Sequence, residues 1–265
     1  MQKRIISLSP SITEILYGIG AEESIAAVSK HCDFPEKAAG KPKISGWADV
    51  RENTIMQHKP DILFTSSYVQ QEVIDSYRKL GVRIEPIVPT TLVGILFSIR
   101  KIGKLAGKEA NAEKLVAAIN KGINTARKKS KFVDRRPRLY IEEWNKPPTV
   151  AGNWVPTLAQ VAGANYSLIK AGHRSREVSL EEIRKYNPEY IVLAVSGTKS
   201  NSRKEWITSR KGWEELKAVK YGQVHVIDES LINRAGPRLV MGAEALGSIM
   251  HPELFGTERL KEIIK

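Results

Sequence analysis

Polar and aromatic side chains follow the apolar runs that predict β-strands at residues 4–9, 25–29 and 61–65. Parallel sheets bind ligands outside the carboxyl ends of their strands. A helix that begins there also offers free amide groups to a polar ligand. We therefore expect a ligand-binding site built from Ser9, Pro10, His31, Ser66, Ser67 and Tyr68. A plain capped turn at Ser9 and Pro10 is the alternative interpretation.

Three tryptophans stand where an aromatic ring could contact a flat ligand. Trp47 lies in a long loop, residues 30–50, that is rich in Pro, Gly and Lys, and long loops tend to be functional. Trp144 and Trp154 flank a Pro-Pro step and Gly152 after the strand predicted at residues 138–142. An aromatic side chain in such a place either packs or binds. The alternatives are a core-edge cover for Trp47 and a core clamp for Trp144 and Trp154.

The triplet His31-Cys32-Asp33 follows the second predicted strand and allows several chemistries. A histidine can coordinate cobalt, iron or zinc, but it can equally be a hydrogen-bonding loop residue. A thiol nucleophile at Cys32 with His31 as its base is disfavoured, because adjacent residues of an extended loop point apart. Arg234, before the helix predicted at residues 237–249, could hold ligand amides or phosphate. Its alternative is a surface cap or a salt bridge.

No enzyme motif accompanies these residues. The chain has no Gly-x-Gly-x-x-Gly, P-loop, nucleophile elbow or His-Glu-x-x-His, and its five histidines are scattered. We therefore expect neither a catalytic nor a metal site, and no required cofactor.

One pattern occurs twice, about 128 residues apart. Residues 53–65 and 181–194 each read as a short amphipathic helix, an x-Pro-acid step and an apolar run. Proline ends the helix, and the apolar run is typical of a buried strand. Two copies indicate two similar α/β lobes with mostly parallel sheets, and a ligand cleft between lobes.

Other predicted elements complete these lobes. They are strands at 82–88, 190–195 and 223–227, and helices at 11–17, 52–58, 70–80, 91–106, 109–130, 155–162, 180–186, 211–218 and 237–249. The first helix is expected to open with a capping box from Ser11 to Glu14. The domain prediction is an N-terminal lobe at 1–106, a linking helix at 107–136 and a C-terminal lobe at 137–265.

Composition sets further bounds. Of 265 residues, 42% are apolar, which supports a core, and one cysteine permits no internal disulfide. No apolar run is long enough to span a bilayer, and no secretory leader is present, which predicts a cytoplasmic protein unless a leader was removed. The net charge of +13 is spread along the chain without a nucleic-acid motif. We expect a monomer that does not bind nucleic acid.

The chain resembles the class III substrate-binding proteins, the iron-siderophore and vitamin B12 type, over nearly its full length. The resemblance rests on the order of Arg4–Glu14, Val28–Pro35, Lys59-Pro60-Asp61, Asn187-Pro188-Glu189 and Asn233–Arg238. It is greatest to the cobalamin-binding branch, which places a Trp at the position of Trp47. Haem-binding relatives place an iron-ligating Tyr there. The implied fold is two Rossmann-like lobes joined by a long helix.

The resemblance also implies docking on a transporter through one acidic residue per lobe. The C-lobe position matches Glu181, whereas the N-lobe position matches Asn53, with Glu52 one residue earlier. That departure puts docking on an ABC permease in doubt. The expected function is binding of cobalamin or a related corrinoid, as the solute-binding component of an ABC-type uptake system or as a cytosolic homologue. The alternatives are a ferric siderophore or haem carrier, and a cytosolic enzyme or regulator that uses the corrinoid cleft.

Overall fold

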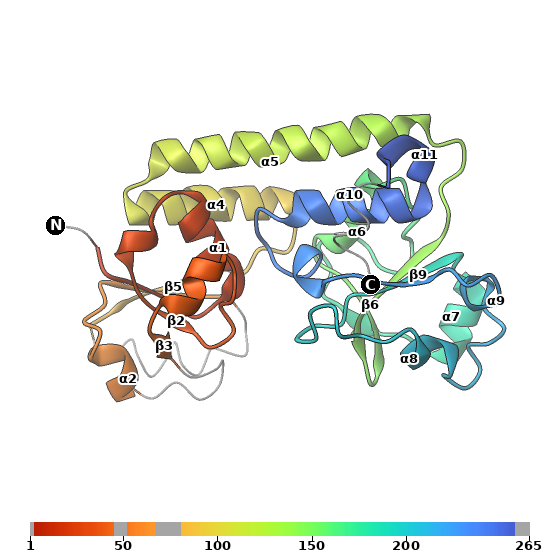
Figure 1. Cartoon of the computed structure of the whole chain (residues 1–265), viewed down its shortest axis with the longest axis horizontal. Coiled ribbons are helices and arrows are strands. Elements are labelled where there is room, and N and C mark those ends of the chain that lie inside the picture. Colours follow the sequence, from red (N-terminus) through yellow and green to blue (C-terminus); the bar gives the residue numbers. More distant parts are fainter. Residues whose placement is uncertain (1–2, 45–51, 67–80, 258–265) are drawn as a thin grey trace. The chain divides into compact units, whose positions relative to one another are not determined.

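The computed structural model describes residues 3–44, 52–66 and 81–257, in two compact units (Figure 1). Unit 1 consists of Met1–Pro89, Val93–Ala118 and Ala235–Pro237. Unit 2 consists of Thr90–Leu92, Ile119–Arg234 and Arg238–Lys265. The sequence-based boundaries at residues 106/107 and 136/137 stay a prediction.

Unit 1 contains a five-stranded parallel sheet in the order β3-β2-β1-β4-β5. Its strands are β1 (Ile5–Ser7), β2 (Ile25–Ser29), β3 (Lys43–Ile44), β4 (Ile62–Thr65) and β5 (Arg83–Pro86). Its shorter elements are α1 (Pro10–Gly18), η1 (Glu22–Ser24), η2 (Glu36–Gly40) and α2 (Glu52–Met56). The predicted strands are confirmed, β2 with the predicted bounds and β1, β4 and β5 with narrower ones. The elements η2 and β3 lie in the stretch predicted as loop. The helix predicted at 70–80 falls outside the described residues.

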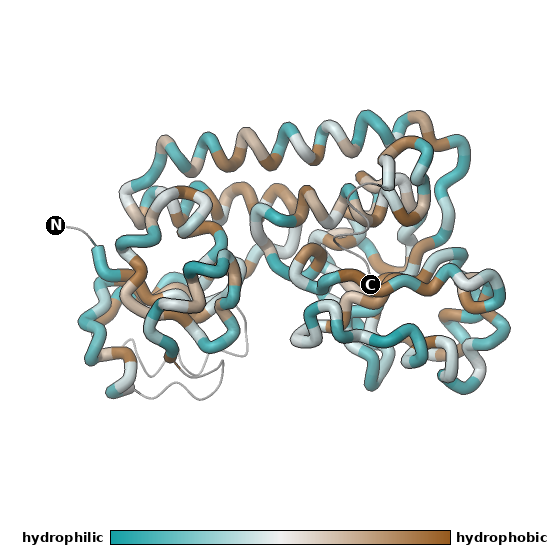
Figure 2. Tube along the Cα trace, in the orientation of Figure 1, coloured by the Kyte–Doolittle hydropathy of each residue, from teal (hydrophilic) through white to brown (hydrophobic). Residues whose placement is uncertain are grey.

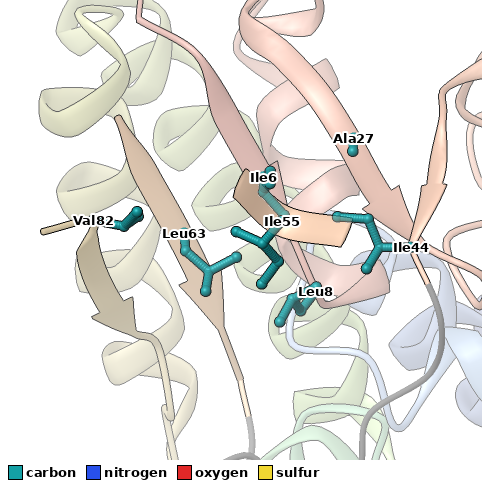
Figure 3. Close-up of a cluster of buried hydrophobic side chains, with 7 residues drawn as sticks. All are labelled: Ile6, Leu8, Ala27, Ile44, Ile55, Leu63 and Val82. Carbon is teal, nitrogen blue, oxygen red and sulfur yellow. The ribbon is translucent and has the colours of Figure 1, made fainter. Parts of the chain in front are cut away.

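One layer of the core of unit 1 consists of aliphatic side chains between the sheet and α2 (Figure 3). The cluster comprises Ile6, Leu8, Ala27, Ile44, Ile55, Leu63 and Val82. Strands buried on both faces read as continuous apolar runs rather than alternating ones. This explains why the apolar runs at 4–9 and 61–65 predicted strands correctly.

Two long helices, α4 (Leu92–Ala106) and α5 (Glu109–Lys129), confirm the helices predicted at 91–106 and 109–130. Gly107 separates them with φ +67°, a conformation that favours glycine. Gly103 lets the two helices approach, because a Cβ at this position would lie 2.4 Å from the Ala112 Cβ. Polar and apolar residues alternate along α5 (Figure 2), and its buried face includes Ile119, Ile123 and Ala126.

Unit 2 contains a mixed sheet in the order β10-β9-β6-β7-β8. The strands β6 (Leu139–Asn145), β9 (Tyr190–Leu193) and β10 (Val224–Val226) are parallel, and β7 (Pro148–Val150) and β8 (Arg176–Glu177) are antiparallel. Its helical elements are η5 (Ser130–Phe132), α6 (Val155–Val161), α7 (Leu180–Tyr186), α8 (Glu205–Thr208), α9 (Lys217–Lys220), η6 (Glu229–Leu231), α10 (Leu239–Met250) and α11 (Pro252–Phe255).

The helix predicted at 211–218 is wrong over most of its length. Only α9 forms there, and it begins at Lys217. Gly212 adopts φ +85°, which a continuous right-handed helix does not allow, and Trp213 is buried at 2% exposure. The apolar period in this stretch therefore reflects burial of irregular turns.

The sequence repeat corresponds to a repeated structural unit. The starts of α2 and α7 at Glu52 and Leu180, and those of β4 and β9 at Ile62 and Tyr190, each differ by 128 in residue number. The residue before each repeated proline has a positive φ, 45° at Lys59 and 47° at Asn187. In both copies a left-handed residue followed by proline thus separates the helix from the strand: Asn187 directly caps α7, whereas Lys59 lies three residues beyond the end of α2.

An arginine and an acidic residue close both copies in the same way. The backbone N–H of Arg4 donates to Asp61 Oδ2 at 2.7 Å, and that of Arg138 donates to Glu189 Oε2 at 3.1 Å. Each arginine Nε donates to a carbonyl between the repeated helix and its proline, that of His58 at 2.8 Å or Asn187 at 2.9 Å. The acid of the x-Pro-acid step therefore fixes the start of the neighbouring strand in each unit.

Among the described residues, no helix combines the length and apolar character needed to cross a bilayer.

Candidate ligand-binding site

Three predicted site segments of unit 1 lie at one edge of its sheet. Strand β1 pairs in parallel with both β2 and β4, so the carboxyl ends of these strands meet there. Ser9 and Pro10 follow β1, His31 follows β2, and Ser66 follows β4. The structure thus brings the predicted residues of this unit together, as far as they are described.

The Ser9 hydroxyl faces the protein interior. Ser9 is the N-cap of α1 and is 3% exposed, but its side chain does not cap the helix. Its Oγ lies 2.9 Å from Ser11 Oγ instead. Helix α1 begins at Pro10, so Ser11 is already in the first turn and the predicted capping box with Glu14 is wrong. What this turn offers a ligand is backbone N–H groups rather than the Ser9 side chain.

A buried hydroxyl and thiol network lies beneath this edge. The Thr13 Oγ1 is 2.9 Å from Ser7 Oγ and 3.1 Å from Cys32 Sγ, and Ser29 Oγ is 3.3 Å from the same sulfur. Cys32 is 1% exposed, and burial raises the pKa of its thiol. A buried thiol with a raised pKa is a poor nucleophile, which agrees with the expectation that Cys32 is not a nucleophile. The adjacent His31 side chain is exposed.

Thr65, the last residue of β4, is a candidate that sequence reasoning missed. It is fully buried, and its Oγ1 has no hydrogen-bond partner among the described residues. A buried hydroxyl without a partner is costly. It lies next to Ser66 at the carboxyl end of β4, and its position at the end of an apolar run was the signal that could have found it.

In unit 2, Trp144 is the exposed aromatic side chain at the carboxyl end of β6. It is 50% exposed and sits opposite Thr149 in the β6–β7 hairpin. Its Nε1 donates to the Lys146 carbonyl at 3.1 Å, which orients the indole ring. An exposed and oriented ring can stack on a flat ligand.

Trp154 has the opposite environment. It is 9% exposed, and its Nε1 donates to the Ile232 carbonyl at 2.7 Å. This geometry favours the core-clamp alternative for Trp154. The surroundings of Arg234 likewise favour the salt-bridge alternative, because its side chain is 12% exposed and lies 3.9 Å from Glu229 in an ion pair. Ligand contact by Trp154 and Arg234 stays a prediction.

Asn233, beside Arg234, is a second polar group that the sequence analysis did not single out individually. Its Nδ2 donates to the Ala194 carbonyl at 2.6 Å and to Ser196 Oγ at 3.0 Å, just beyond the carboxyl end of β9. Its Oδ1 is buried without a hydrogen-bond partner among the described residues. This acceptor can receive an N–H or O–H from a ligand.

A buried ion pair supports the end of β6. The Arg210 guanidinium contacts both carboxylate oxygens of Glu142 at 2.7 Å, and the Tyr140 hydroxyl donates to Glu142 Oε2 at 3.0 Å. Burial raises the pKa of the Glu142 carboxyl, and Arg210 opposes this shift. Arg210 also lies 4.3 Å from the Trp213 ring and donates to the Asn145 carbonyl at 3.3 Å. It thereby anchors the hairpin that carries Trp144.

Glu143, next in the strand, is a second carboxylate in a shielded setting. It accepts a hydrogen bond from Ser175 Oγ, which in turn accepts one from the Gly152 N–H at 2.9 Å. Burial raises the pKa of Glu143, and the Ser175 hydrogen bond opposes the shift. The link ties β6 to the loop around Ser175.

Trp47, Ser67 and Tyr68 lie outside the described residues, so their expected contacts stay predictions. Among the residues that the structure does describe, no cluster of three or more His, Cys, Asp or Glu side chains could hold a metal ion.

The predicted docking residues occupy matching places in the repeated unit. Glu181 is exposed in the first turn of α7, where Ser179 caps the helix by accepting from the Glu182 N–H at 3.1 Å. Helix α2 begins at Glu52, and the exposed Asn53 holds the place of Glu181. An acidic side chain in the first turn is stabilised by the helix dipole.

Comparison with known proteins places these features in a family. The sequence profile described as "Periplasmic binding protein" matches residues 5–231. The uncharacterized ABC transporter substrate-binding lipoprotein YvrC of Bacillus subtilis (strain 168) is 26% identical over 261 residues, 96% of this chain and 81% of its own length. The vitamin B12-binding protein of Yersinia pestis (strain Pestoides F) is 25% identical over 251 residues, 92% of this chain and 85% of its own.

Solved structures show the same fold. A periplasmic heme binding protein from Pseudomonas aeruginosa superposes with a TM-score of 0.83 at 20% identity, covering 96% of this chain and 94% of its own. The periplasmic vitamin B12 binding protein of Vibrio cholerae gives a TM-score of 0.77 at 22% identity, covering 94% of this chain and 96% of its own.

Proposed function

Because the chain belongs to the periplasmic binding protein family, we propose that it is the solute-binding component of an ABC-type uptake system, with cobalamin or a related corrinoid as its ligand. The family consists of binding proteins rather than enzymes, which sets aside the enzymatic alternative. The similarity to a vitamin B12-binding protein over 92% of the chain carries the choice of ligand.

The groups at the strand ends of each unit, one exposed ring and several polar groups, suit a flat ligand with a polar rim. Trp144 offers a half-exposed indole ring for stacking. Asn233 Oδ1 and Thr65 Oγ1 offer buried hydrogen-bonding groups that lack a partner among the described residues. The α1 N-terminus after Ser9 adds amide donors. Corrin rings carry amide side chains that both donate and accept hydrogen bonds, which complements the polar groups of either unit taken by itself.

A haem or ferric siderophore is the second candidate, because a solved structure of a heme-binding protein shares the fold at a TM-score of 0.83. The two candidates differ in their absorption spectra. The purified chain should be mixed in turn with cyanocobalamin, haemin and a ferric siderophore, repurified, and its spectrum recorded. A corrinoid spectrum at one ligand per chain supports the proposal. A haem or siderophore spectrum without retained corrinoid refutes it.

A tryptophan variant localises the site. A buried aromatic contact contributes about 1–3 kcal/mol, so Trp144→Ala should weaken cyanocobalamin binding about 5- to 150-fold. Tyr221→Ala is the matched control, because Tyr221 is an aromatic residue of unit 2 that is 74% exposed directly after α9. Equal affinities of both variants and the wild type, measured by titration calorimetry, would show that Trp144 does not touch the ligand.

We propose that Glu181 contacts the permease when the chain docks on it. The side chain is exposed at the helix start, and the similarity to an ABC transporter substrate-binding lipoprotein supports a transporter partner despite Asn53. Pull-down with the permease encoded nearest the gene should recover a complex that Glu181→Ala weakens and Glu177→Ala, an exposed acid on β8, leaves intact. Failure of the wild-type chain to bind that permease would contradict this part.

A further inference from the structure

A pocket of about 940 Å³ opens in unit 2 between the end of α5, the segment leading to β6, and α6 with the loop after it. Its position is set by Asn165, whose carbonyl accepts from the Leu139 N–H at 3.0 Å, and by the bridge between Asn165 and Arg138. These contacts place the pocket at the amino end of β6. Trp144 lies near the opposite end of this seven-residue strand, roughly 20 Å away along the chain.

Four cationic side chains from separate segments line this pocket: Arg127, Lys131, Arg136 and Lys170. The lining contains no Asp or Glu. None of the four cations forms an ion pair with a carboxylate in the part of the chain that the structure describes. Four like charges around one volume produce a positive potential that attracts anions.

Helix-dipole stabilisation explains part of this arrangement. Arg127 lies in the last turn of α5, where a cation is favoured. Arg136 Nη1 donates to the Gln160 carbonyl at 2.8 Å, and its Nη2 donates to the Ser130 carbonyl at 3.3 Å, so it ties the ends of α5 and α6 together. Lys131 lies in η5, directly after α5, where the same dipole favours a cation. Neither role applies to Lys170, whose ammonium group makes no hydrogen bond to a described residue.

The same contacts prepare Arg136 for binding. A guanidinium group has five N–H donors, and the two carbonyls use two of them. The remaining donors are held in a fixed plane, which reduces the entropy lost when a ligand binds. Arginine in such a setting can bind phosphate oxygens in a bidentate manner. The buried Val161 and Ile169 give the pocket an apolar floor beneath this basic rim.

We propose that this pocket binds a phosphate-bearing ligand, independently of the corrinoid site. Its volume lies within the range of small-molecule sites, about 300–1,000 Å³, and admits two linked phosphates or a phosphate ester with a compact organic group. The chemistry is shared by soluble phosphates and by the headgroup of an anionic phospholipid. Pyrophosphate, adenosine diphosphate and phosphatidylglycerol vesicles are therefore the probes.

The test compares binding of these probes by the full chain and by two charge-matched double variants. Arg136→Gln with Lys170→Gln removes two pocket cations. Arg203→Gln with Lys211→Gln removes two exposed cations of unit 2 that lie outside the pocket. We expect the pocket variant to lose about 10- to 100-fold in affinity for at least one probe, because it removes two charge-assisted hydrogen-bond donors whose contribution is reduced but not abolished by solvent screening. The control should lose less than about 3-fold.

Binding of pyrophosphate or adenosine diphosphate assigns a soluble ligand, and binding confined to phosphatidylglycerol vesicles assigns a lipid headgroup. Equal losses in both variants would reduce the effect to net charge and overturn the proposal, as would binding of none of the three probes. Cyanocobalamin titration of the pocket variant serves as the folding control. The affinity of the pocket variant for cyanocobalamin should equal that of the wild type. If the chain binds no corrinoid, the thermal unfolding midpoint of the variant should equal that of the wild type instead.

Discussion

Replacing Arg210 by Met tests the buried cluster behind the Trp144 hairpin. Glu142 is fully buried, and the Arg210 side chain is 16% exposed. The two groups are 68 residues apart in sequence and make two contacts of 2.7 Å. Methionine keeps much of the aliphatic volume that packs near Trp213 but removes the positive charge, so the variant leaves a buried carboxylate with Tyr140 as its remaining described hydrogen-bond partner.

The size of the effect follows from the burial of the pair. Two unit charges about 4 Å apart interact by about 4 kcal/mol at an effective dielectric constant of about 20. Removing one partner of a buried pair costs about 3–5 kcal/mol in measured cases. We therefore expect Arg210→Met to lower the free energy of unfolding by about 3–5 kcal/mol at pH 7.

The loss should depend on pH in a defined direction. Burial raises the pKa of Glu142, and Arg210 opposes that shift in the wild type, so the variant raises the pKa further. A carboxyl group with a higher pKa in the folded than in the unfolded state destabilises the folded protein as the pH rises. The loss of stability begins near the unfolded-state pKa and is complete above the folded-state pKa. The difference between variant and wild type should therefore be largest at neutral pH and should narrow as the pH falls toward about 4.5.

Denaturant titration followed by tryptophan fluorescence measures this loss, because four of the five tryptophans, residues 144, 154, 206 and 213, belong to unit 2. Arg135→Met is the control, since Arg135 pairs with Glu189 while its side chain is 71% exposed, and exposed pairs contribute about 0–1 kcal/mol. A loss below about 1 kcal/mol for Arg210→Met, or one that grows as the pH falls, would show that the pair does not stabilise unit 2 as reasoned.

Three other changes have expected outcomes in the same denaturant assay. Gly152→Ala should destabilise unit 2 by about 1–3 kcal/mol, because a Cβ there would lie 2.4 Å from the His173 carbonyl oxygen. In Gly40→Ala the added Cβ meets no atom within 4 Å, so this control should be neutral. Equal losses of unfolding free energy in the two variants would contradict this reasoning. Ser179→Ala removes the cap of α7 and should cost about 0.5–2 kcal/mol, with no cost if the cap is dispensable. Burial, with Lys204 nearby, lowers the pKa of His225 to about 4. The wild type should therefore lose stability as the pH falls from about 6.5 toward 4, and His225→Gln should lose less in that range. Parallel curves of unfolding free energy against pH for the two proteins would exclude the shift.

Local signals were enough to predict most of the elements. The prolines at 60 and 188 end two helices, and the apolar runs behind them form β4 and β9 at the predicted places. The helical periods at 91–106 and 109–130 predicted α4 and α5, with Gly107 between them. These signals act within a few residues, through backbone sterics and side-chain period, so sequence alone carries them.

Burial was not predictable in the same way. Trp144 and Trp154 stand in similar sequence surroundings near prolines and glycine, yet one is 50% exposed and the other donates a hydrogen bond into the core. The turn at Gly212 likewise overrode a helical period, because burial of Trp213 requires irregular backbone there. A periodic pattern reports which residues are apolar, but not which neighbours cover them.

Sequence by itself therefore determined the repeat and the α/β alternation, and it placed the polar residues that we expect to bind a ligand after the strands. Only the tertiary structure decided that Arg210 neutralises Glu142, and that Arg127, Lys131, Arg136 and Lys170 converge on one pocket. The physical reason is that desolvation and pairing of charges depend on side chains brought together from segments far apart in the chain. No local spacing encodes those distances.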